Sequence, residues 1–520
     1  MLFCVAYFYH YHHVLFYTPQ SIHQFRQADC LSIALNYYQG DMNFFKPELH
    51  NQMSQGGNSG FAMGEFPIIY YLVAVLWKIF GLHLWLYRFV VIVITFIGLL
   101  ALFKTFEGVL KDSVWALLLT VLFFTSPIVA FYSNNYLTNM PAFSFALVGW
   151  YYFYEFYKKH RTRFLYVSML FFALSGLLKV SSAISYALVL CIFVFELTGW
   201  IKFRNQKKLF NKPAKQFVPI LIVPLLILFW YWFANKFNTY YGGSYTFNSV
   251  WPIWKMTSVQ IAEVWNGFTT FTLHQLFSIT NLWFSALMFV SIMVFVALKK
   301  IRKVHLFVLC ILILGTVFYS LCWFNAFGNH DYYLIDLLML YLFVCLLFFV
   351  GLKNISSRIF NSYITKGVFC VFLVFNILFC QNNMKMRYWI DINKPERFTN
   401  QFEIGGWAYM HEVYIKKQKA YETLSYYLRE IGVTPKDKVI SIPDGSINIS
   451  LVLMNQKGWT SYGFDCKTQG ERIRKLMNLN AKYLLINDSV VYNDSTIMPY
   501  TRYYMGSYEN IDIYDLQMIR

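Results

Sequence analysis

The stretch Leu84–Phe103 reads LWLYRFVVIVITFIGLLALF, twenty residues with a single charged side chain. A helix rises about 1.5 Å per residue and needs roughly twenty apolar residues to cross the hydrocarbon of a bilayer. The stretch therefore predicts a membrane-spanning helix. Lys104 follows it directly and marks where the chain leaves the apolar region.

Similar apolar runs occur along most of the chain. They lie at 1–18, 113–131, 138–157, 164–180, 182–199, 217–235, 276–298, 304–327, 331–351 and 367–383. Only 13% of the residues are charged, whereas a soluble domain has about a quarter. The sequence therefore predicts a polytopic α-helical membrane protein with about eleven transmembrane helices.

Lysine and arginine are concentrated in alternate loops between these runs. The basic loops carry Lys104 and Lys111; Lys158, Lys159, Arg161 and Arg163; Lys202, Arg204, Lys207, Lys208, Lys212 and Lys215; Lys299, Lys300, Arg302 and Lys303; Lys353, Arg358 and Lys366. The loops between them hold few cations. Because positive loops stay in the cytoplasm, this alternation places the segments 19–83, 236–275 and 384–520 outside it, at a bacterial inner membrane.

The net charge of +18 is explained by these basic loops. Once they are set aside, no basic patch interleaved with aromatic residues remains, so we expect membrane lipids and no nucleic acid as partners. The outer loop 236–275 contains YYGGSY at 240–245. That motif is compatible with a polar binding surface and with an ordinary interfacial aromatic belt.

The tail changes character after the last apolar run and predicts a small extracytoplasmic α/β domain at 384–520, following a transmembrane catalytic domain at 1–383. Helices are expected at 421–431, 446–456 and 470–479, and strands at 439–442, 483–486 and 511–514. The tail has neither a GxGxxG motif nor a P-loop, so no motif marks a nucleotide site.

The first outer loop, 19–83, holds two clusters of chemistry-bearing residues. A helix is expected to open around His23–Asp29 and to end at Gly40, with Arg26 and Asp29 three residues apart on one face. This pair is either a surface ion pair of little energetic value or a carboxylate and a guanidinium presented together. Glu65 precedes Pro67 and a further helix, where it either favours the helix dipole or serves as a functional carboxylate.

Two further clusters follow later in the chain. Lys179 ends the apolar run 164–180, where it either reaches the membrane interface or binds an anionic lipid headgroup. His330 and Asp331 precede Tyr332 and Tyr333 where an outer loop meets the next span. They are either ordinary loop residues or part of a site.

All four clusters fall on the same predicted side of the membrane. Carboxylates act as bases or bind divalent cations, and lysine and arginine neutralise phosphates. This combination favours transfer from a phosphate-activated lipid at the membrane surface. Because the periplasm has no supply of nucleotide sugars, a polyprenyl-linked donor is expected.

The order of these features resembles the GT-C membrane glycosyltransferases, in particular the bacterial group related to protein O-mannosyltransferases and the aminoarabinose transferase of lipid A. The shared order comprises an acidic residue after the first span, a Glu-x-Pro segment, a Leu-Leu-Lys segment and a late His-x-Tyr-Tyr segment. The resemblance covers roughly residues 1–350, and each motif is short.

The resemblance implies a role for each matching residue. Asp29 matches the catalytic aspartate of the family's first loop, which acts as a base towards the acceptor or supports a metal. Glu65 matches the acidic residue of the second motif. Lys179 and Tyr333 match residues that lie near the phosphate of the lipid-linked donor.

The sequence also departs from the family pattern. Asp29 lacks the Glu and Arg that often follow it, although Arg26, one turn earlier, is placed to replace the arginine at the phosphate. Phe66 stands where relatives have lysine, and Asn139 where some carry aspartate. Asn139 and His330 remain further candidates, and it stays open whether Asp29 and Glu65 hold a divalent metal ion.

The resulting prediction is a glycosyltransferase that inverts the anomeric carbon. It would transfer a hexosyl or pentosyl group from a polyprenyl-phosphate donor to a lipid, glycan or protein acceptor of the cell envelope. The alternatives are a transporter or flippase of lipid-linked glycans, a polysaccharide polymerase, and a non-catalytic assembly protein. A transporter should show broken helices or charges in mid-membrane, whereas the ionisable residues here lie mainly at span ends.

Overall fold

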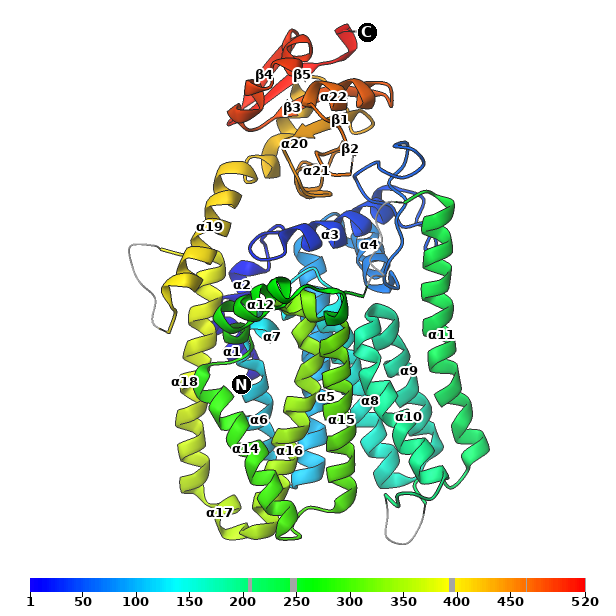
Figure 1. Cartoon of the computed structure of the whole chain (residues 1–520), viewed down its shortest axis with the longest axis vertical. Helices are drawn as coiled ribbons and strands as arrows, with labels where there is room; N and C mark the ends of the chain where they lie inside the picture. Colours follow the sequence, from blue (N-terminus) through cyan, green and yellow to red (C-terminus); the bar gives the residue numbers. More distant parts are fainter. Residues whose placement is uncertain (204–207, 244–249, 392–397, 464, 520) are drawn as a thin grey trace.

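The computed structural model describes residues 1–203, 208–243, 250–391, 398–463 and 465–519. A bundle of long helices forms most of the molecule, and a small sheet domain sits beyond one end of it (Figure 1). Between the two lie helices α3 (Gln24–Gln39) and α4 (Ile68–Phe80), so that α3 crosses the end of the bundle beneath the sheet domain.

The helices of the bundle follow the predicted apolar runs. They are α5 (Trp85–Leu110), α6 (Ser113–Phe124), α7 (Pro127–Ser133), α8 (Asn139–Lys159), α9 (Thr162–Leu178), α10 (Ile184–Leu197), α11 (Pro213–Tyr240), α14 (Ile279–Ala297), α15 (Lys303–Cys322), α16 (Leu338–Ile355) and α18 (Tyr363–Tyr388). By length and composition, seven helical segments of the described chain are suited to cross a membrane, or eight if one bent pair is counted. The membrane fold class is confirmed, while the number eleven stays a prediction.

Two of the predicted runs are not single straight helices. The run 1–18 forms two short helices, α1 (Leu2–Phe8) and α2 (Tyr11–Val14), separated at His10, which has a left-handed φ of 60°. The run 113–131 is broken between α6 and α7, which meet at 81°. Pro127 begins α7, and because proline has no N–H it cannot continue the hydrogen-bond ladder of α6.

The basic loops meet at the end of the bundle opposite α3, which we call the basic end (Figure 1). Lys366 Nζ lies 2.6 Å from Asp112 Oδ2, and Asn354 Nδ2 donates to the carbonyl of Lys300 over 2.9 Å. We call the other end, which carries α3 and the sheet domain, the site end. Of the residues in the predicted loops, Arg204, Lys207, Ser244 and Tyr245 lie outside the described part.

The first outer loop folds as predicted around its two helices. Helix α3 ends before Gly40, and α4 begins directly after Pro67. Most side chains of α3 are buried, because the bundle covers one side of the helix and the sheet domain covers the other. Arg26 is 9% exposed and Asp29 is 1% exposed, so the alternative of a surface ion pair is wrong.

The tail forms a five-stranded sheet in the order β2-β1-β3-β5-β4. Strands β1 (Lys438–Ile442), β2 (Gly458–Trp459) and β3 (Ala481–Ile486) are parallel, and β5 (Ile511–Asp515) runs antiparallel to β3 and β4 (Tyr504–Tyr508). Helices α20 (Tyr421–Glu430) and α22 (Gln469–Met477) match the predicted ones. Helix α19 (Gln401–Lys417) and strands β2 and β4 were not predicted.

The predicted helix 446–456 is shorter in the structure. It is α21 (Ile449–Leu453), because residues 444–448 form a capping turn in which Asp444 Oδ2 accepts from the amide of Ser450 over 2.9 Å. This shortening has a consequence for the site. Asn448, in the turn, points its side chain at α3 and donates to Asp29.

Candidate active site

The centre of the site is the Arg26 guanidinium, which lies between two carboxylates. Its Nη2 is 3.1 Å from Glu65 Oε1, and its Nη1 is 3.6 Å from Asp29 Oδ2. The three side chains are at most 11% exposed. Removing one partner of a buried pair costs about 3–5 kcal/mol, so the three charges depend on one another.

Glu65 is held at the start of α4 by neutral donors as well as by Arg26. Its Oε1 accepts from the Tyr70 hydroxyl over 2.9 Å and from the Thr138 hydroxyl over 3.2 Å. Burial works to raise the pKa of Glu65, but the charges of Arg26 and Lys179 outweigh it and hold the pKa below its usual range. Glu65 is therefore an ionised acceptor at neutral pH.

Asp29 is reached by the sheet domain from the opposite side. Its Oδ1 accepts from Asn448 Nδ2 over 2.8 Å, and Asn448 Oδ1 accepts from the amide of Asn51 over 2.9 Å. The Asn448 side chain thus links Asp29 on α3 to Asn51, which lies farther along the first outer loop. A substrate that reaches Asp29 has to approach beside this contact or displace it.

Lys179 lies at a break in the bundle on the same side as Glu65. It caps the C-terminus of α9 with an extended φ of −152°, and a short 3₁₀ helix, η1 (Val180–Ala183), follows. Its Nζ is 5.0 Å from the centre of the Tyr333 ring and 5.6 Å from that of Tyr332. The predicted phosphate-binding pair, Lys179 and Tyr333, is therefore brought together.

Asp331 forms a buried junction rather than part of an ordinary loop. It is 1% exposed, with Oδ1 3.3 Å from His23 Nε2 and Oδ2 3.6 Å from Arg387 Nη2. The hydroxyl of Tyr132 donates to the same carboxylate. These contacts attach the start of α3 to α7 and α18, and so they fix where Arg26 and Asp29 lie.

His330 and Asn139 lie next to this junction. The His330 ring stacks on that of His23 with centroids 5.1 Å apart, and burial lowers the pKa of His330 to about 3, helped by the neighbouring His23. His330 is therefore neutral at pH 7. Asn139, at the start of α8, has Nδ2 3.4 Å from the carbonyl of Tyr332, a long contact with the backbone beside Tyr333.

The donors around Asp29 and Glu65 do not fit a dedicated metal site. Within the described residues, no group of three His, Cys, Asp or Glu side chains is placed to hold a metal ion. Both carboxylates already face the Arg26 guanidinium, which supplies the positive charge at this point. Asn139 adds an amide where some relatives carry a carboxylate.

Sequence reasoning missed several of these partners, namely Tyr70, Thr138, Asn448, Tyr132 and Arg387. Most of them are single polar residues far along the chain from Asp29 and Glu65, and no local pattern marks them. Arg387 did carry a signal. Arg387 is a cation that follows the last apolar run, on the predicted side of the membrane where the loops hold few cations.

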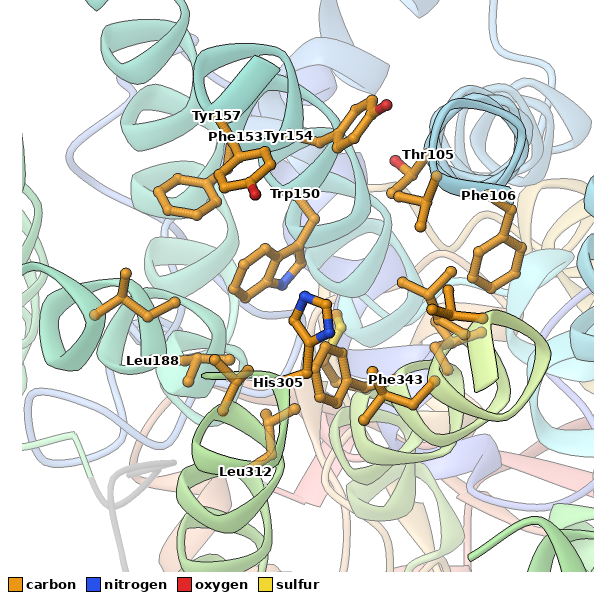
Figure 2. Close-up of a pocket in the computed structure, with 18 of the residues that line it drawn as sticks. Thr105, Phe106, Trp150, Phe153, Tyr154, Tyr157, Leu188, His305, Leu312 and Phe343 are labelled. Carbon is orange, nitrogen blue, oxygen red and sulfur yellow. The ribbon is translucent and has the colours of Figure 1, made fainter. Parts of the chain in front are cut away.

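A cavity of about 450 Å³ lies between α5, α8, α10, α15 and α16 (Figure 2). Its walls are mainly apolar and aromatic, with Phe106, Trp150, Leu188 and Phe343 among them. Arg302 and His305, from the start of α15, also line it. Walls of this kind are suited to a hydrocarbon chain.

Comparison with known proteins gives a family match over part of the chain and a shared fold. Residues 65–232 match the sequence model of the dolichyl-phosphate-mannose-protein mannosyltransferase family, a segment that includes Glu65 and Lys179. Comparison with curated protein sequences gave no match. Over this segment, the match bears out the resemblance to GT-C glycosyltransferases that the sequence motifs indicate.

The protein is similar to two crystal structures of ArnT from Cupriavidus metallidurans. The apo state has a TM-score of 0.53 at 8% identity, covering 96% of this chain and 95% of that one. The structure bound to undecaprenyl phosphate has a TM-score of 0.55 at 9% identity, covering 99% and 97%. The shared architecture thus extends over both the bundle and the tail.

Proposed function

We propose that the protein transfers a sugar from a polyprenyl-phosphate-linked donor to an acceptor of the cell envelope, on the extracytoplasmic side of the membrane. The observation that carries this proposal is the buried arrangement of Asp29, Arg26 and Glu65 with Lys179 at the same end. This places a candidate base and two cations together at the end of the bundle that has few basic loops.

The donor phosphate is assigned to the space beside Lys179. The ammonium group there lies over the rings of Tyr332 and Tyr333, at an end of the bundle where the helix α9 is interrupted. The polyprenyl chain would follow the apolar helices towards the cavity of Figure 2. The ArnT structure with the same fold was determined with undecaprenyl phosphate, which supports this class of donor.

The transfer step is a displacement with inversion. Asp29 takes the proton of an acceptor hydroxyl as its oxygen forms a bond to the anomeric carbon. The bond between that carbon and the phosphate oxygen breaks, and polyprenyl phosphate leaves with the electron pair. Lys179 and Arg26 stabilise the negative charge on the departing phosphate, an electrostatic role that usually supplies the largest part of catalysis.

Glu65 acts as a positioning residue for Arg26. Because Glu65 stays ionised and accepts from Tyr70 and Thr138, it fixes the guanidinium between Asp29 and the phosphate site. Arg26 in turn faces Asp29, with its Nη1 3.6 Å from Asp29 Oδ2. No metal ion is needed for this division of roles.

The test begins with the natural acceptor. Mass spectrometry of envelope glycans from a deletion strain identifies the missing sugar, and that sugar linked to undecaprenyl phosphate is then supplied to the purified protein in membranes. We expect Asp29→Asn to reduce transfer by about 10²–10⁴-fold. The matched control is Asp41→Asn, an exposed aspartate of the same loop, which should transfer normally.

Retention of transfer in Asp29→Asn would remove Asp29 as the base. A deletion strain with unchanged glycans but an altered distribution of lipid-linked sugars across the membrane would instead favour a flippase. These outcomes separate an enzyme from a transporter, which hydropathy alone does not do.

A further inference from the structure

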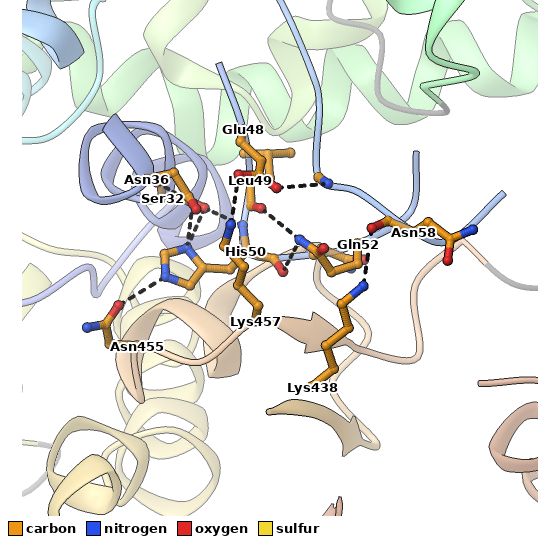
Figure 3. A network of polar contacts seen from close by, with 12 residues as sticks. Ser32, Asn36, Glu48, Leu49, His50, Gln52, Asn58, Lys438, Asn455 and Lys457 are labelled. Carbon is orange, nitrogen blue, oxygen red and sulfur yellow. Dashed lines mark hydrogen bonds and ion pairs between the residues drawn. The ribbon is translucent and has the colours of Figure 1, made fainter. Parts of the chain in front are cut away.

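A second cavity, of about 660 Å³ and lined mainly by polar residues, lies where the C-terminal half of α3 meets the sheet domain. Its wall is built by α3 and His50 of the first outer loop, by α20 with the turn after it, by the first residue of β1, and by the turn between α21 and β2. The lining residues are Asn36, Gln39, Gly40, His50, Ser425, Tyr426, Arg429, Pro435, Lys436, Lys438, Asn455 and Lys457. Figure 3 shows the part of this wall around His50.

The charge of the wall has one sign. Four of the lining residues are cations, and none of the described residues that line the cavity is acidic. Lys436 is exposed, whereas Lys438 and Lys457 are half-buried; Lys438 begins β1, and Lys457 directly precedes β2, the parallel strand beside it. Clustered positive charge around a concave surface attracts anions.

Part of this charge is already compensated, because Lys457 Nζ is 2.7 Å from Glu48 Oε2. Arg429 Nη2 donates over 2.6 Å to Gln456, a neutral amide that leaves the positive charge in place. Lys438 donates to the carbonyl of Asn58 over 3.2 Å. Arg429, Lys436 and Lys438 therefore carry the positive charge that an anion in the cavity would meet.

Neutral hydrogen-bonding groups lie beside these cations, among them Asn36, His50 and Asn455 (Figure 3). Burial lowers the pKa of His50 to about 4, so its ring is neutral at pH 7. With Nε2 donating to Asn455 over 3.1 Å, Nδ1 accepts from Ser32 over 2.8 Å and from Asn36 over 3.2 Å. Asn36 Nδ2 is thereby used, and Asn36 Oδ1 is buried with no partner among the described residues.

The neutral part of the wall complements a hydroxyl group. The neutral side chains that line the cavity, among them Gln39, Ser425 and Tyr426, offer donors and acceptors to a ligand hydroxyl. Together the cations and the neutral groups fit a ligand that carries hydroxyls and an anionic group on one small framework. A phosphorylated or carboxylated sugar has this chemistry.

The cavity is connected to the candidate base by two helices. Asp29 and Asn36 are seven residues apart on α3, a rise of roughly 10 Å. Asn448, directly before α21, contacts Asp29. Asn455, just after the end of α21, contacts His50. The distance is about that of one or two sugar residues along a glycan.

We propose that this cavity binds an anionic group, phosphate or carboxylate, on the glycan acceptor and so places a hydroxyl of that glycan at Asp29. The inference rests on the proposed transferase function and adds the class of acceptor. It assigns to Lys436 and Lys438 a role in acceptor specificity, and to the neutral side chains of the cavity the recognition of a sugar hydroxyl.

The test uses the full-length protein in detergent and three probes: glucose 6-phosphate, glucose and inorganic phosphate. We expect calorimetry to show the tightest binding for glucose 6-phosphate, since only this probe offers both chemistries. K436Q/K438Q should weaken it by about tenfold or more, because charged hydrogen bonds are lost. K436R/K438R should retain binding, and so should the matched control Lys467→Gln, an exposed lysine of the same domain.

Three results would overturn the inference. They are equal affinity for glucose 6-phosphate and inorganic phosphate, unchanged binding in K436Q/K438Q, and displacement of glucose 6-phosphate by phosphatidylglycerol nanodiscs, which would indicate a lipid headgroup instead. Because Lys438 packs over Trp459, Lys436→Gln alone serves where the double variant unfolds.

The same variants separate this inference from the proposed function. If the inference alone fails, Asp29→Asn still abolishes transfer while the lysine variants use the acceptor normally. If the proposed function alone fails, wild-type protein shows no transfer, yet glucose 6-phosphate still binds in a lysine-dependent manner. Asp29→Asn itself should leave glucose 6-phosphate binding unchanged.

Discussion

The two halves of helix α3 lie in different electrostatic settings. In the N-terminal half, Arg26 is enclosed between Asp29 and Glu65 and is almost entirely shielded from solvent. In the C-terminal half, cations of the sheet domain line a cavity whose other lining residues are neutral. Buried charges of both signs suit a reaction centre, whereas positive charges alone around a cavity suit the binding of an anion. The helix thus joins chemistry to recognition.

The largest difference between the halves should appear when one cation is removed from each. Arg26→Leu leaves two buried carboxylates without their partner, and we expect it to lower the free energy of unfolding by about 3–5 kcal/mol and to abolish transfer. Lys436→Gln removes an exposed charge and should change stability by less than about 1 kcal/mol. Thermal unfolding in detergent measures both.

Similar stabilities for these two variants would contradict the comparison. Arg26→Lys provides the internal control, since it keeps the charge but not the planar group that contacts both carboxylates. Its stability should lie between those of wild type and Arg26→Leu.

The next effect concerns the donor. Lys179→Met should weaken binding of undecaprenyl phosphate by about tenfold or more, because a charged contact with the phosphate is lost. Lys236, an exposed lysine at the end of α11, provides the matched control as Lys236→Met. Binding can be followed by native mass spectrometry of the purified protein.

Equal loss of lipid in both variants would show that the site end attracts the phosphate only through its general charge. Glucose 6-phosphate binding should be unaffected by Lys179→Met, because the second cavity lies at the other half of α3.

A smaller effect is expected at the contact between the sheet domain and the N-terminal half of α3. Asn448→Ala removes the hydrogen bond to Asp29, which should lower the free energy of unfolding by about 1–3 kcal/mol. Transfer should fall while donor binding stays unchanged, since the sheet domain no longer holds Asp29. An unchanged transfer rate would mean that the domain does not position the base.

The last effect, a pH dependence at His50, appears only on acidification. Its folded pKa of about 4 lies below the ordinary value of 6.5, so between these pH values the unfolded chain binds the extra proton. The free energy of unfolding therefore falls as the pH drops through this window, by at most about 1.4 kcal/mol per pH unit for one proton. His50→Gln should flatten the pH profile of the melting temperature, and an identical profile would contradict this assignment.

Sequence reasoning recovered the parts of this molecule that local patterns encode. The apolar runs gave the helices of the bundle, Gly40 and Pro67 gave the limits of α3 and α4, and Arg26 and Asp29 were placed on one face. The motif order also indicated the resemblance to GT-C glycosyltransferases, which the family match over residues 65–232 bears out for that segment. Apart from the motif order, each of these signals lies within about twenty neighbouring residues.

What the sequence did not reveal depends on contacts between distant segments. Asn448 reaches Asp29 across 419 positions, and the second cavity combines residues of the first outer loop with residues near 430 and 455. The bend between α6 and α7 was missed because hydropathy is continuous across Pro127. The burial of Arg26 and Asp29 follows only from how the sheet domain covers α3.

The most direct test of the central claim is a structure of the full-length protein with undecaprenyl phosphate in a lipid nanodisc. The account predicts density for the phosphate beside Lys179 and the Tyr333 ring, with the chain running along the apolar helices, and loss of that density in Lys179→Met. A phosphate bound at the basic end, or one that stays in place in Lys179→Met, would contradict the proposed transfer site.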